Sequence, residues 1–326
     1  MRYGTAEGVG KPVSRVVLGT MIVTTNERER SFRLLDDALA VGCTTLDTAH
    51  VYAGGTSERC IGDWMRERGN RGEVVVVSKG AHPNADRRRV TPYDIAADLH
   101  DSLARLKTDY IDLYLLHRDD PAVPVGEIVD ALDEHRRAGR IRAYGGSNWT
   151  HERLQAANDY AATHGRAPFV ASSPNYSLAE QINDPWGQGS GSVTLSGPAN
   201  AAARAWYART RMPVFAWSSL ARGFFSGRIT RGNFESVKGS IDGACLRAYC
   251  HEPNFRRLDR VEMLAREKGL SVPQVAMAYV MSQPLDVFAL VGAQDKGELQ
   301  AAIDACDMHL APAKLAWLDL ESDEKP

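Results

Sequence analysis

The chain has 326 residues, 44% of them hydrophobic, which is enough for one large domain or two ordinary ones with a substantial core. A formal net charge of −2 and the lack of an apolar run of about 18 residues argue against nucleic acid and membranes as partners. Five cysteines at spacings that match no metal template, with no opening signal peptide, predict reduced thiols in a cytoplasmic protein without a metal site.

Short apolar runs recur along the chain and predict eight strands. They cover residues 15–18, 45–47, 74–79, 111–117, 142–147, 169–173, 214–217 and 287–291. Most are hydrophobic without interruption, as in VVVV at residues 74–77. Such runs are typical of parallel strands that are covered on both faces.

Apolar residues at helical spacing predict helices between these strands. The shared faces are Phe32, Leu35 and Leu39; Ile61, Trp64 and Met65; Ile95, Leu99, Leu103 and Leu106; Leu258, Val261 and Ala265; and Val272, Val275, Ala276 and Tyr279. The third stripe is the best defined, because Thr91 supplies an N-cap and Pro92 follows at the first helical position.

Strand and helix alternate in a way that is typical of parallel β/α units. Eight units in about 300 residues favour a (β/α)8 TIM barrel, formed by residues 1–326 as a single domain. A doubly wound open sheet is the alternative, but it would need a glycine-rich phosphate turn after the first strand. That strand is followed by LGTMIV, which contains no GxGxxG pattern.

Two segments interrupt the alternation. Residues 177–197 are rich in glycine and serine, and residues 220–253 are also long and irregular. Loops of this length in a compact domain are usually functional lids or disordered. They follow the sixth and seventh predicted strands, and in a barrel such insertions lie on the face that carries the active site.

Polar residues close neighbouring strands of the predicted barrel. Asp47 ends the second strand, Lys79 the third and His117 the fourth, and Tyr52 follows Asp47 after five residues. Taken alone, a strand-end lysine, a hydrogen-bonded histidine or a capping aspartate needs no functional explanation. The carboxyl ends of parallel barrel strands share one face, however, so we expect these four side chains to converge.

Proton transfer would explain why these four residue types occur together. A free tyrosine has a pKa of about 10, which makes it a poor proton donor at pH 7. We expect Lys79 to lower the pKa of Tyr52, Asp47 to hold Lys79 charged, and His117 to hydrogen-bond a substrate carbonyl. The four residues thus predict a general acid for a carbonyl oxygen that becomes an alkoxide. Since no side chain supplies a hydride, a nicotinamide cofactor is implied.

Over nearly its whole length the chain resembles the aldo-keto reductases. Six segments match in order and spacing: VSRVVLGTM, LDTAHVYAGGTSE, VVVVSKG, DYIDLYLLHRDD, YGGSNW and FAWSSLARGFFSGR. The resemblance implies a (β/α)8 barrel that reduces a small aldehyde or ketone with NAD(P)H bound without a Rossmann motif. It also implies a catalytic tetrad of Asp47, Tyr52, Lys79 and His117, with Tyr52 as the proton donor.

The resemblance further implies which residues bind the dinucleotide. They are Gly19, Thr20, Met21, Ser147, Asn148, Ser173, Trp217, Ser218, Leu220, Arg222, Gly292, Gln294 and Glu298. Ser147 and Asn148 would hold the carboxamide, and Trp217 would stack on the nicotinamide in place of the family's tyrosine. Ser218, Leu220 and Arg222 would wrap the pyrophosphate. Ser173 stands where the family commonly has glutamine, and its shorter side chain would reach the carboxamide less well.

The adenosine end departs from the family pattern. Members often place an arginine there for the 2′-phosphate and an asparagine for adenine, whereas VGAQDKGELQAA offers Gln294, Asp295, Glu298 and Ala302. Glu298 and Asp295 would repel a phosphate, and only Lys296 would attract it. NADPH is the usual cofactor of the family, but these charges favour NADH or use of both.

The polar, glycine-rich segment at residues 177–197 favours a sugar-derived or small polar carbonyl as the substrate. A different class of function stays open. The same barrel can serve as a cofactor-sensing regulatory subunit with negligible turnover, as in the β subunits of potassium channels. The complete tetrad favours catalysis, and the sequence indicates no oligomeric state.

Overall fold

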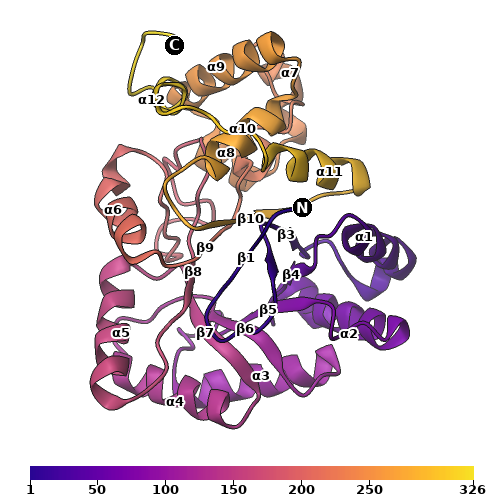
Figure 1. The fold of residues 1–326 in the computed structure, drawn as a ribbon, viewed down its shortest axis with the longest axis vertical. Coiled ribbons are helices and arrows are strands. Elements are labelled where there is room, and N and C mark those ends of the chain that lie inside the picture. The colour runs from indigo at the N-terminus through magenta and orange to yellow at the C-terminus, as the bar shows by residue number, and fades with distance from the viewer.

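The computed structural model describes residues 1–326 and contains a closed barrel of eight parallel strands (Figure 1). In barrel order, starting from the strand nearest the C-terminus, these are β10 (Val287–Val291), β3 (Val16–Gly19), β4 (Thr45–Asp47), β5 (Val75–Gly80), β6 (Ile111–Leu116), β7 (Ile141–Ser147), β8 (Ala171–Ser173) and β9 (Val214–Ala216). All eight predicted strands and the predicted TIM barrel are confirmed, and the open sheet is excluded.

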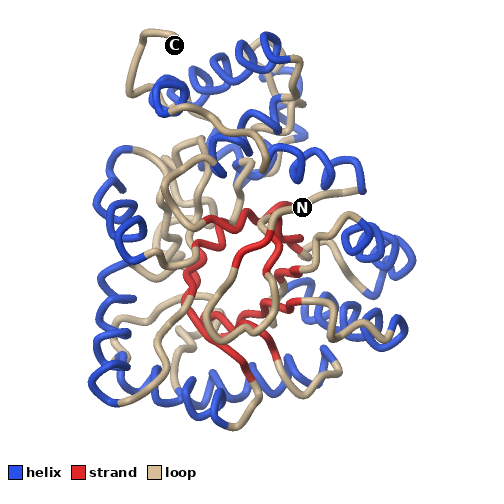
Figure 2. Tube along the Cα trace, in the orientation of Figure 1, coloured by secondary structure: helices blue, strands red, loops and turns tan.

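Helices surround this ring of strands (Figure 2). They are α1 (Arg28–Ala40), α2 (Thr56–Arg68), α3 (Pro92–Leu106), α4 (Val125–Arg137), α5 (His151–His164), α6 (Ala201–Thr210), α7 (Phe234–Val237), α8 (Gly243–Tyr249), α9 (Glu252–Lys268), α10 (Val272–Met281), α11 (Lys296–Ala305) and α12 (Pro312–Leu318). The start of α3 matches the sequence prediction, because the Thr91 hydroxyl accepts a hydrogen bond from the Asp94 amide and Pro92 is the first helical residue. None of the helices combines the length and the apolar character that crossing a membrane requires.

Side chains fill the barrel and divide the core into two clusters. One lies between strands and helices, and the smaller one lies inside the barrel and includes Val17, Val77 and Leu115. An antiparallel hairpin of β1 (Tyr3–Gly4) and β2 (Val13–Ser14) closes one end of the barrel.

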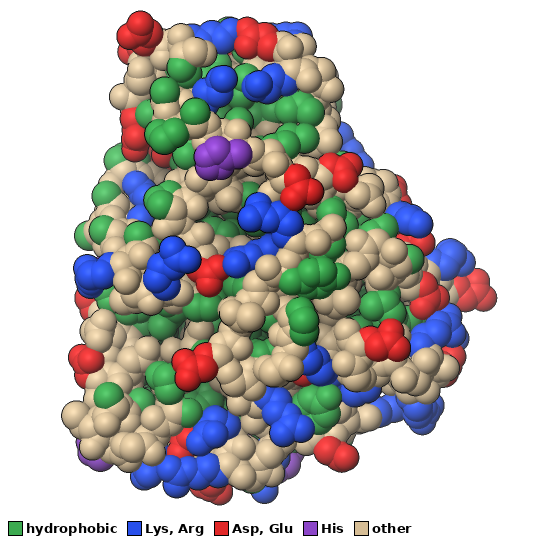
Figure 3. All heavy atoms as spheres, in the orientation of Figure 1, with side chains coloured by type: hydrophobic (Ala, Val, Ile, Leu, Met, Phe, Trp, Pro, Cys, Tyr) green, Lys and Arg blue, Asp and Glu red, His purple; other side chains and the backbone are tan.

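The hairpin covers the amino-terminal ends of the strands. Ser14 donates its amide hydrogen to Thr45 at the start of β4, and Lys11 pairs with Asp112 near the start of β6 at 2.9 Å. Figures 1 to 3 view the molecule from this closed end, where basic and acidic side chains are interspersed over the surface (Figure 3). The carboxyl ends of the strands therefore open on the opposite face.

Two long segments follow the sixth and seventh barrel strands, as predicted. Residues 177–197 contain no helix or strand. Residues 220–253, however, include the short helices α7 and α8 and the start of α9, so the prediction of a purely irregular segment was wrong. Helices of four and seven residues span two turns or fewer, which is too short for an apolar periodicity to be recognised in sequence.

Candidate active site

Asp47, Lys79 and Tyr52 meet at the carboxyl ends of two neighbouring strands. Asp47 ends β4 and Lys79 lies near the end of β5, which pairs with β4 in parallel register. The Lys79 ammonium donates to Asp47 Oδ1 at 2.6 Å, to the Thr48 carbonyl at 2.9 Å and to the Tyr52 hydroxyl at 3.3 Å. Asp47 and Lys79 are each only 2% exposed. Their mutual attraction therefore offsets the free energy that burying each charge costs.

Tyr52 is aimed at Lys79 by a strained turn. It begins a 3-10 turn, Tyr52–Gly55, and its amide donates to the Ala49 carbonyl at 3.0 Å. Ala53 has a φ of 48°, in the left-handed region that a residue with a Cβ seldom adopts. Strain of this kind is retained mainly where the surrounding structure fixes a functional side chain.

His117 follows β6 and completes the group. Its amide donates to the Gly80 carbonyl at 2.7 Å, which ties it to the end of β5. The imidazole lies edge-on to the Tyr52 ring, with 5.8 Å between centroids, and its Nδ1 is buried without a hydrogen-bond partner. Asp47, Tyr52, Lys79 and His117 thus converge as the topology predicted.

Burial and charge set the protonation states of these groups. Burial raises the pKa of Tyr52, and this effect outweighs the opposing effect of Lys79. Lys79 lowers the pKa of Tyr52, as the sequence predicted, but burial, which the sequence prediction did not include, makes the net shift upward. Burial, and then Lys79 and Arg118, hold the pKa of His117 well below its usual range. At neutral pH the site pairs a protonated phenol with a neutral imidazole.

The ion pair shows the same competition. Burial acts to lower the pKa of Lys79, but Asp47 and Tyr52 outweigh it and raise that pKa. Burial also raises the pKa of Asp47, against the attraction of Lys79. In both groups burial disfavours the charged form and the partner favours it.

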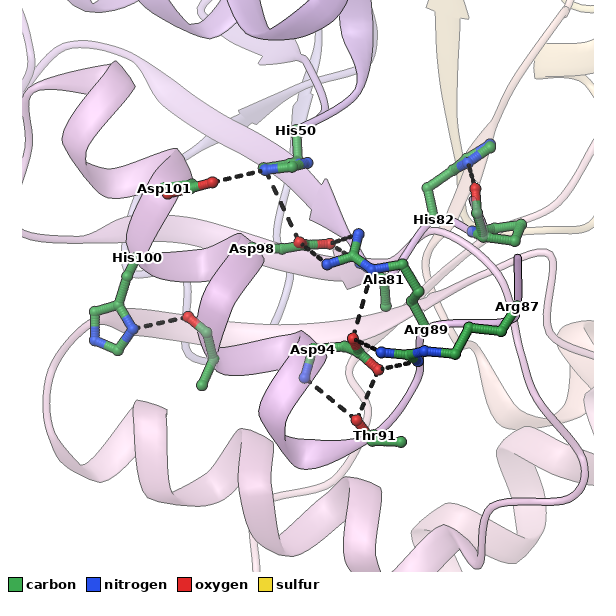
Figure 4. A network of polar contacts seen from close by, with 12 residues as sticks. His50, Ala81, His82, Arg87, Arg89, Thr91, Asp94, Asp98, His100 and Asp101 are labelled. Atoms are coloured by element: carbon green, nitrogen blue, oxygen red, sulfur yellow. Dashed lines mark hydrogen bonds and ion pairs between the residues drawn. The ribbon is translucent and has the colours of Figure 1, made fainter. Parts of the chain in front are cut away.

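The segment after β5 is held against α3 by polar contacts (Figure 4). Arg89 contacts both carboxylate oxygens of Asp98, at 2.5 and 3.1 Å, and the Ala81 amide donates to Asp98 at 2.8 Å. His82, in the same segment, packs edge-on against the His117 ring with 4.8 Å between centroids. This clamp fixes one wall of the site.

Residues assigned to the carboxamide lie together at the ends of β7 and β8. The Ser147 hydroxyl donates to the Ser173 carbonyl at 3.0 Å, and the side-chain amide of Asn148 donates to the Ser147 hydroxyl at 3.0 Å. The Trp217 indole donates to Asn148 Oδ1 at 3.2 Å. The Ser173 hydroxyl, in contrast, is fully buried and has no partner. A buried unpaired hydroxyl is costly, so this position fits a polar group brought by a bound nicotinamide.

The loop after β9 has an unusual backbone. Ser218, Ala221 and Arg222 all have φ between 50° and 54°. Arg222 donates to Asp242 at 2.7 Å, and its guanidinium lies 4.6 Å from the centroid of the Trp186 ring. Arg222 therefore connects the segments at residues 177–197 and 220–253, and it can meet a pyrophosphate only by sharing its charge with Asp242.

Near β3 the predicted cofactor residues behave differently from one another. Gly19 ends the strand, and the fully buried Thr20 donates its hydroxyl to the Asp47 carbonyl at 2.9 Å. Thr20 thus fixes the backbone at Asp47. Met21 is 54% exposed, so it is open to a ligand at the mouth. Leu220 is half-buried, and Gly292 follows the last strand, β10.

The adenosine end carries more positive charge than the local sequence indicates. The Glu298 carboxylate accepts hydrogen bonds from the backbone amide of Gln294 at 2.9 Å and from the Arg228 guanidinium at 3.3 Å. Arg30 from α1 donates to the Gln294 side chain. Arg30 and Arg228 are thus two further cations, besides Lys296, near the predicted adenosine end. Ala302 is buried, so no side chain from that position reaches a ligand.

Comparison with known proteins agrees with this geometry. A model of the Aldo/keto reductase family matches residues 15–320. The uncharacterized oxidoreductase YrpG of Bacillus subtilis is 30% identical over 98% of this chain and 95% of its own. The aryl-alcohol dehydrogenase (NADP+) of Phanerodontia chrysosporium is 28% identical over 96% of this chain and 84% of its own.

A solved structure shares the fold. The glycerol dehydrogenase of Gluconobacter oxydans has a TM-score of 0.76 and 24% identity, covering 97% of this chain and 94% of its own. The family match extends over almost all of the barrel and includes the strand ends that hold the polar group described above. The chain is an NAD(P)H-dependent oxidoreductase, and it belongs to the Aldo/keto reductase family.

Proposed function

We propose that this enzyme reduces a small polar or sugar-derived aldehyde or ketone to the alcohol, with NADPH as the preferred cofactor and residues 1–326 as one catalytic domain. Carbonyl reduction in general follows from the family. The finer proposal rests on one observation above all. The buried Lys79 ammonium contacts both the Asp47 carboxylate and the Tyr52 hydroxyl, which arranges a proton donor at the open end of the barrel.

A reduced nicotinamide, if held by the residues assigned to it, would supply the hydride that the carbonyl carbon accepts. Tyr52 gives its proton to the carbonyl oxygen as that oxygen becomes an alkoxide, and Lys79 stabilises the phenolate that is left. Neutral His117 donates a hydrogen bond to the same oxygen and orients the carbonyl. The unpaired hydroxyl of Ser173, with Ser147 and Asn148, would hold the carboxamide of the cofactor.

The first test is turnover. The purified protein, mixed with NADPH and a panel of glyceraldehyde, xylose and benzaldehyde, should consume NADPH only when an aldehyde is present. Tight binding of NADPH without consumption for any carbonyl would contradict the proposal, and it would support the sensor subunit that the sequence leaves open.

Cofactor choice should depend on the basic residues at the adenosine end. Replacing Arg228 with Met should lower the affinity for NADPH about tenfold and leave that for NADH nearly unchanged, because a 2′-phosphate contact is lost. Glu298→Arg should shift the NADPH/NADH affinity ratio in the opposite direction. Both ratios can be measured by titration of tryptophan fluorescence, which Trp217 should report.

Arg231→Met is the matched control for these variants. Arg231 is another exposed arginine of the same segment, but it pairs with Glu252 and Asp259. Its loss should leave the affinity ratio unchanged. If Arg228→Met weakens NADPH and NADH equally, Arg228 does not contact the 2′-phosphate.

The rate of reduction should be nearly independent of pH in the neutral range. Because the pKa of Tyr52 is raised, its hydroxyl stays protonated until the pH exceeds about 10. Because the pKa of His117 lies well below its usual range, the imidazole stays neutral at every pH above about 6.5. A profile of kcat/KM for aldehyde reduction should be flat between these two pH values. It should fall once the pH exceeds the upper value, where Tyr52 loses its proton. An inflection near pH 7 would contradict the assignment of a neutral His117.

A further inference from the structure

Arg118 is a buried cation without a carboxylate partner. It follows His117 directly in the sequence and is only 8% exposed. Its Nε donates to the Ser190 carbonyl at 3.0 Å and its Nη1 to the His117 carbonyl at 2.8 Å. Nη2 makes no hydrogen bond, and no carboxylate lies within ion-pair distance of the guanidinium. A cation held in this way costs free energy until an anion reaches it.

The guanidinium borders a cavity at the mouth of the barrel. The cavity has a volume of about 240 Å³ and lies between the segment after β5 and the segment at residues 189–191. Pro83 lines it and accepts a hydrogen bond from His82, whose ring packs on His117. Two lining residues are thus chain neighbours of this pair, since Pro83 follows His82 and Arg118 follows His117.

The charges around this cavity favour an anion. Arg87 is compensated by Asp94, with two contacts of 2.7 Å, and Asp119 is compensated by Arg153. The lining residues that remain without an ion pair are two cations, Arg88 and Arg118, and one exposed carboxylate, Asp86. The cavity lining therefore has an excess of positive charge.

Asp184 is a further carboxylate whose charge acts on Arg118. Its oxygens accept hydrogen bonds from the hydroxyls of Ser190, at 2.7 and 2.6 Å, and of Ser192 at 3.3 Å. Asp184 is thus occupied within its own loop and forms no ion pair with Arg118.

Arg118 lies next to His117, since its guanidinium donates to the His117 carbonyl at 2.8 Å. Burial lowers the pKa of Arg118, while Tyr52 and Asp184 act in the opposite direction. Arg118 in turn lowers the pKa of both Tyr52 and His117. A guanidinium remains charged in proteins at neutral pH, so Arg118 supplies a fixed positive charge next to His117, in addition to that of Lys79.

We propose that Arg118 determines substrate specificity by binding a carboxylate on the carbonyl substrate, so that the preferred substrates are aldehydes or ketones with an acid group beyond the reacting carbon. This inference rests on the proposed function. A planar guanidinium with free N–H groups on one edge matches a carboxylate closely. The small-residue sequence at positions 189–191 leaves room for that group next to the arginine.

Matched substrates test this without a variant. The wild-type enzyme should reduce 4-carboxybenzaldehyde with a kcat/KM about 10- to 100-fold above that for 4-methylbenzaldehyde, the range expected for one charged hydrogen-bonded contact. The same ratio should appear for 4-oxobutanoate against butanal. High salt should reduce both ratios if Arg118 acts through its charge.

Variants then assign the effect to the residue. Arg118→Met should bring the ratio for each substrate pair close to one, and Arg118→Lys should retain part of it. Any loss of activity common to both members of a pair cancels in the ratio. Arg33→Met, which removes an exposed cation from α1, should leave the ratio as in the wild type.

The outcomes separate the two proposals. If the uncharged aldehydes are reduced and the acids show no advantage, or if Arg118→Met keeps the advantage, the role of Arg118 is refuted while the proposed function stands. If no aldehyde is reduced with either NADPH or NADH, the proposed function fails and the specificity inference fails with it.

Discussion

Replacement of Tyr52 by Phe should lower kcat for aldehyde reduction by about 10²- to 10⁴-fold, the range that a positioned general acid contributes. The substitution removes the hydroxyl that lies 3.3 Å from the Lys79 ammonium and leaves the ring in place. The edge-on packing of that ring against His117 is kept, so the shape of the pocket should not change. The loss is measured by steady-state NADPH consumption with saturating aldehyde.

Cofactor binding separates a chemical defect from a structural one. The affinity of Tyr52→Phe for NADPH, measured by fluorescence titration, should stay close to the wild-type value because no residue assigned to the cofactor is altered. Tyr93→Phe is the matched control, since Tyr93 is 79% exposed on α3 and should tolerate the loss of its hydroxyl. Wild-type turnover in Tyr52→Phe would rule out Tyr52 as the proton donor.

The strands could be predicted because of where they lie. A parallel barrel strand is covered by helices on one side and by barrel contents on the other, so its sequence is apolar throughout, as in residues 74–77. Helices with strong apolar stripes, such as α3, were equally clear. Helix α5 was not, since it buries only Leu154, Ala157 and Ala161, and a face with two alanines scarcely differs from a polar one.

The convergence of Asp47, Lys79 and His117 could be predicted because topology alone brings strand ends together. Contacts that depend on loop conformation could not. Arg30 and Arg228 reach the adenosine end from α1 and from the segment after β9, and nothing in VGAQDKGELQAA signals them. The effect of Lys79 on the pKa of Tyr52 was predicted with the right sign, but the larger, opposing effect of burial could not be read from the sequence.

Replacement of Lys79 by Met should affect both stability and activity. It leaves the Asp47 carboxylate buried without a partner, and breaking a buried ion pair in this way costs about 3–5 kcal/mol of unfolding free energy. Urea unfolding at pH 7 measures this loss. Turnover should fall as well, because nothing then stabilises the phenolate that Tyr52 becomes.

The loss of unfolding free energy in Lys79→Met should grow as the pH rises. In the variant only burial acts on Asp47, so its pKa in the folded state lies above the value in the unfolded state. The folded variant then holds a proton that the unfolded chain releases, and its stability falls as the pH rises from about 4, the unfolded pKa. Near pH 4 the variant should therefore approach the wild type in stability. A deficit that is constant with pH would mean that Asp47 is not the source.

A double variant distinguishes the two roles of the lysine. Lys79→Met combined with Asp47→Asn removes both charges, so most of the lost unfolding free energy should return, since a buried pair replaced as a whole costs little. Activity should not return, because the phenolate still lacks its cation. If the double variant recovered turnover together with stability, Lys79 would serve only to neutralise Asp47, and the proton donor would work without it. If it recovered stability alone, the ion pair would be the means by which the fold holds a charged, buried lysine against Tyr52.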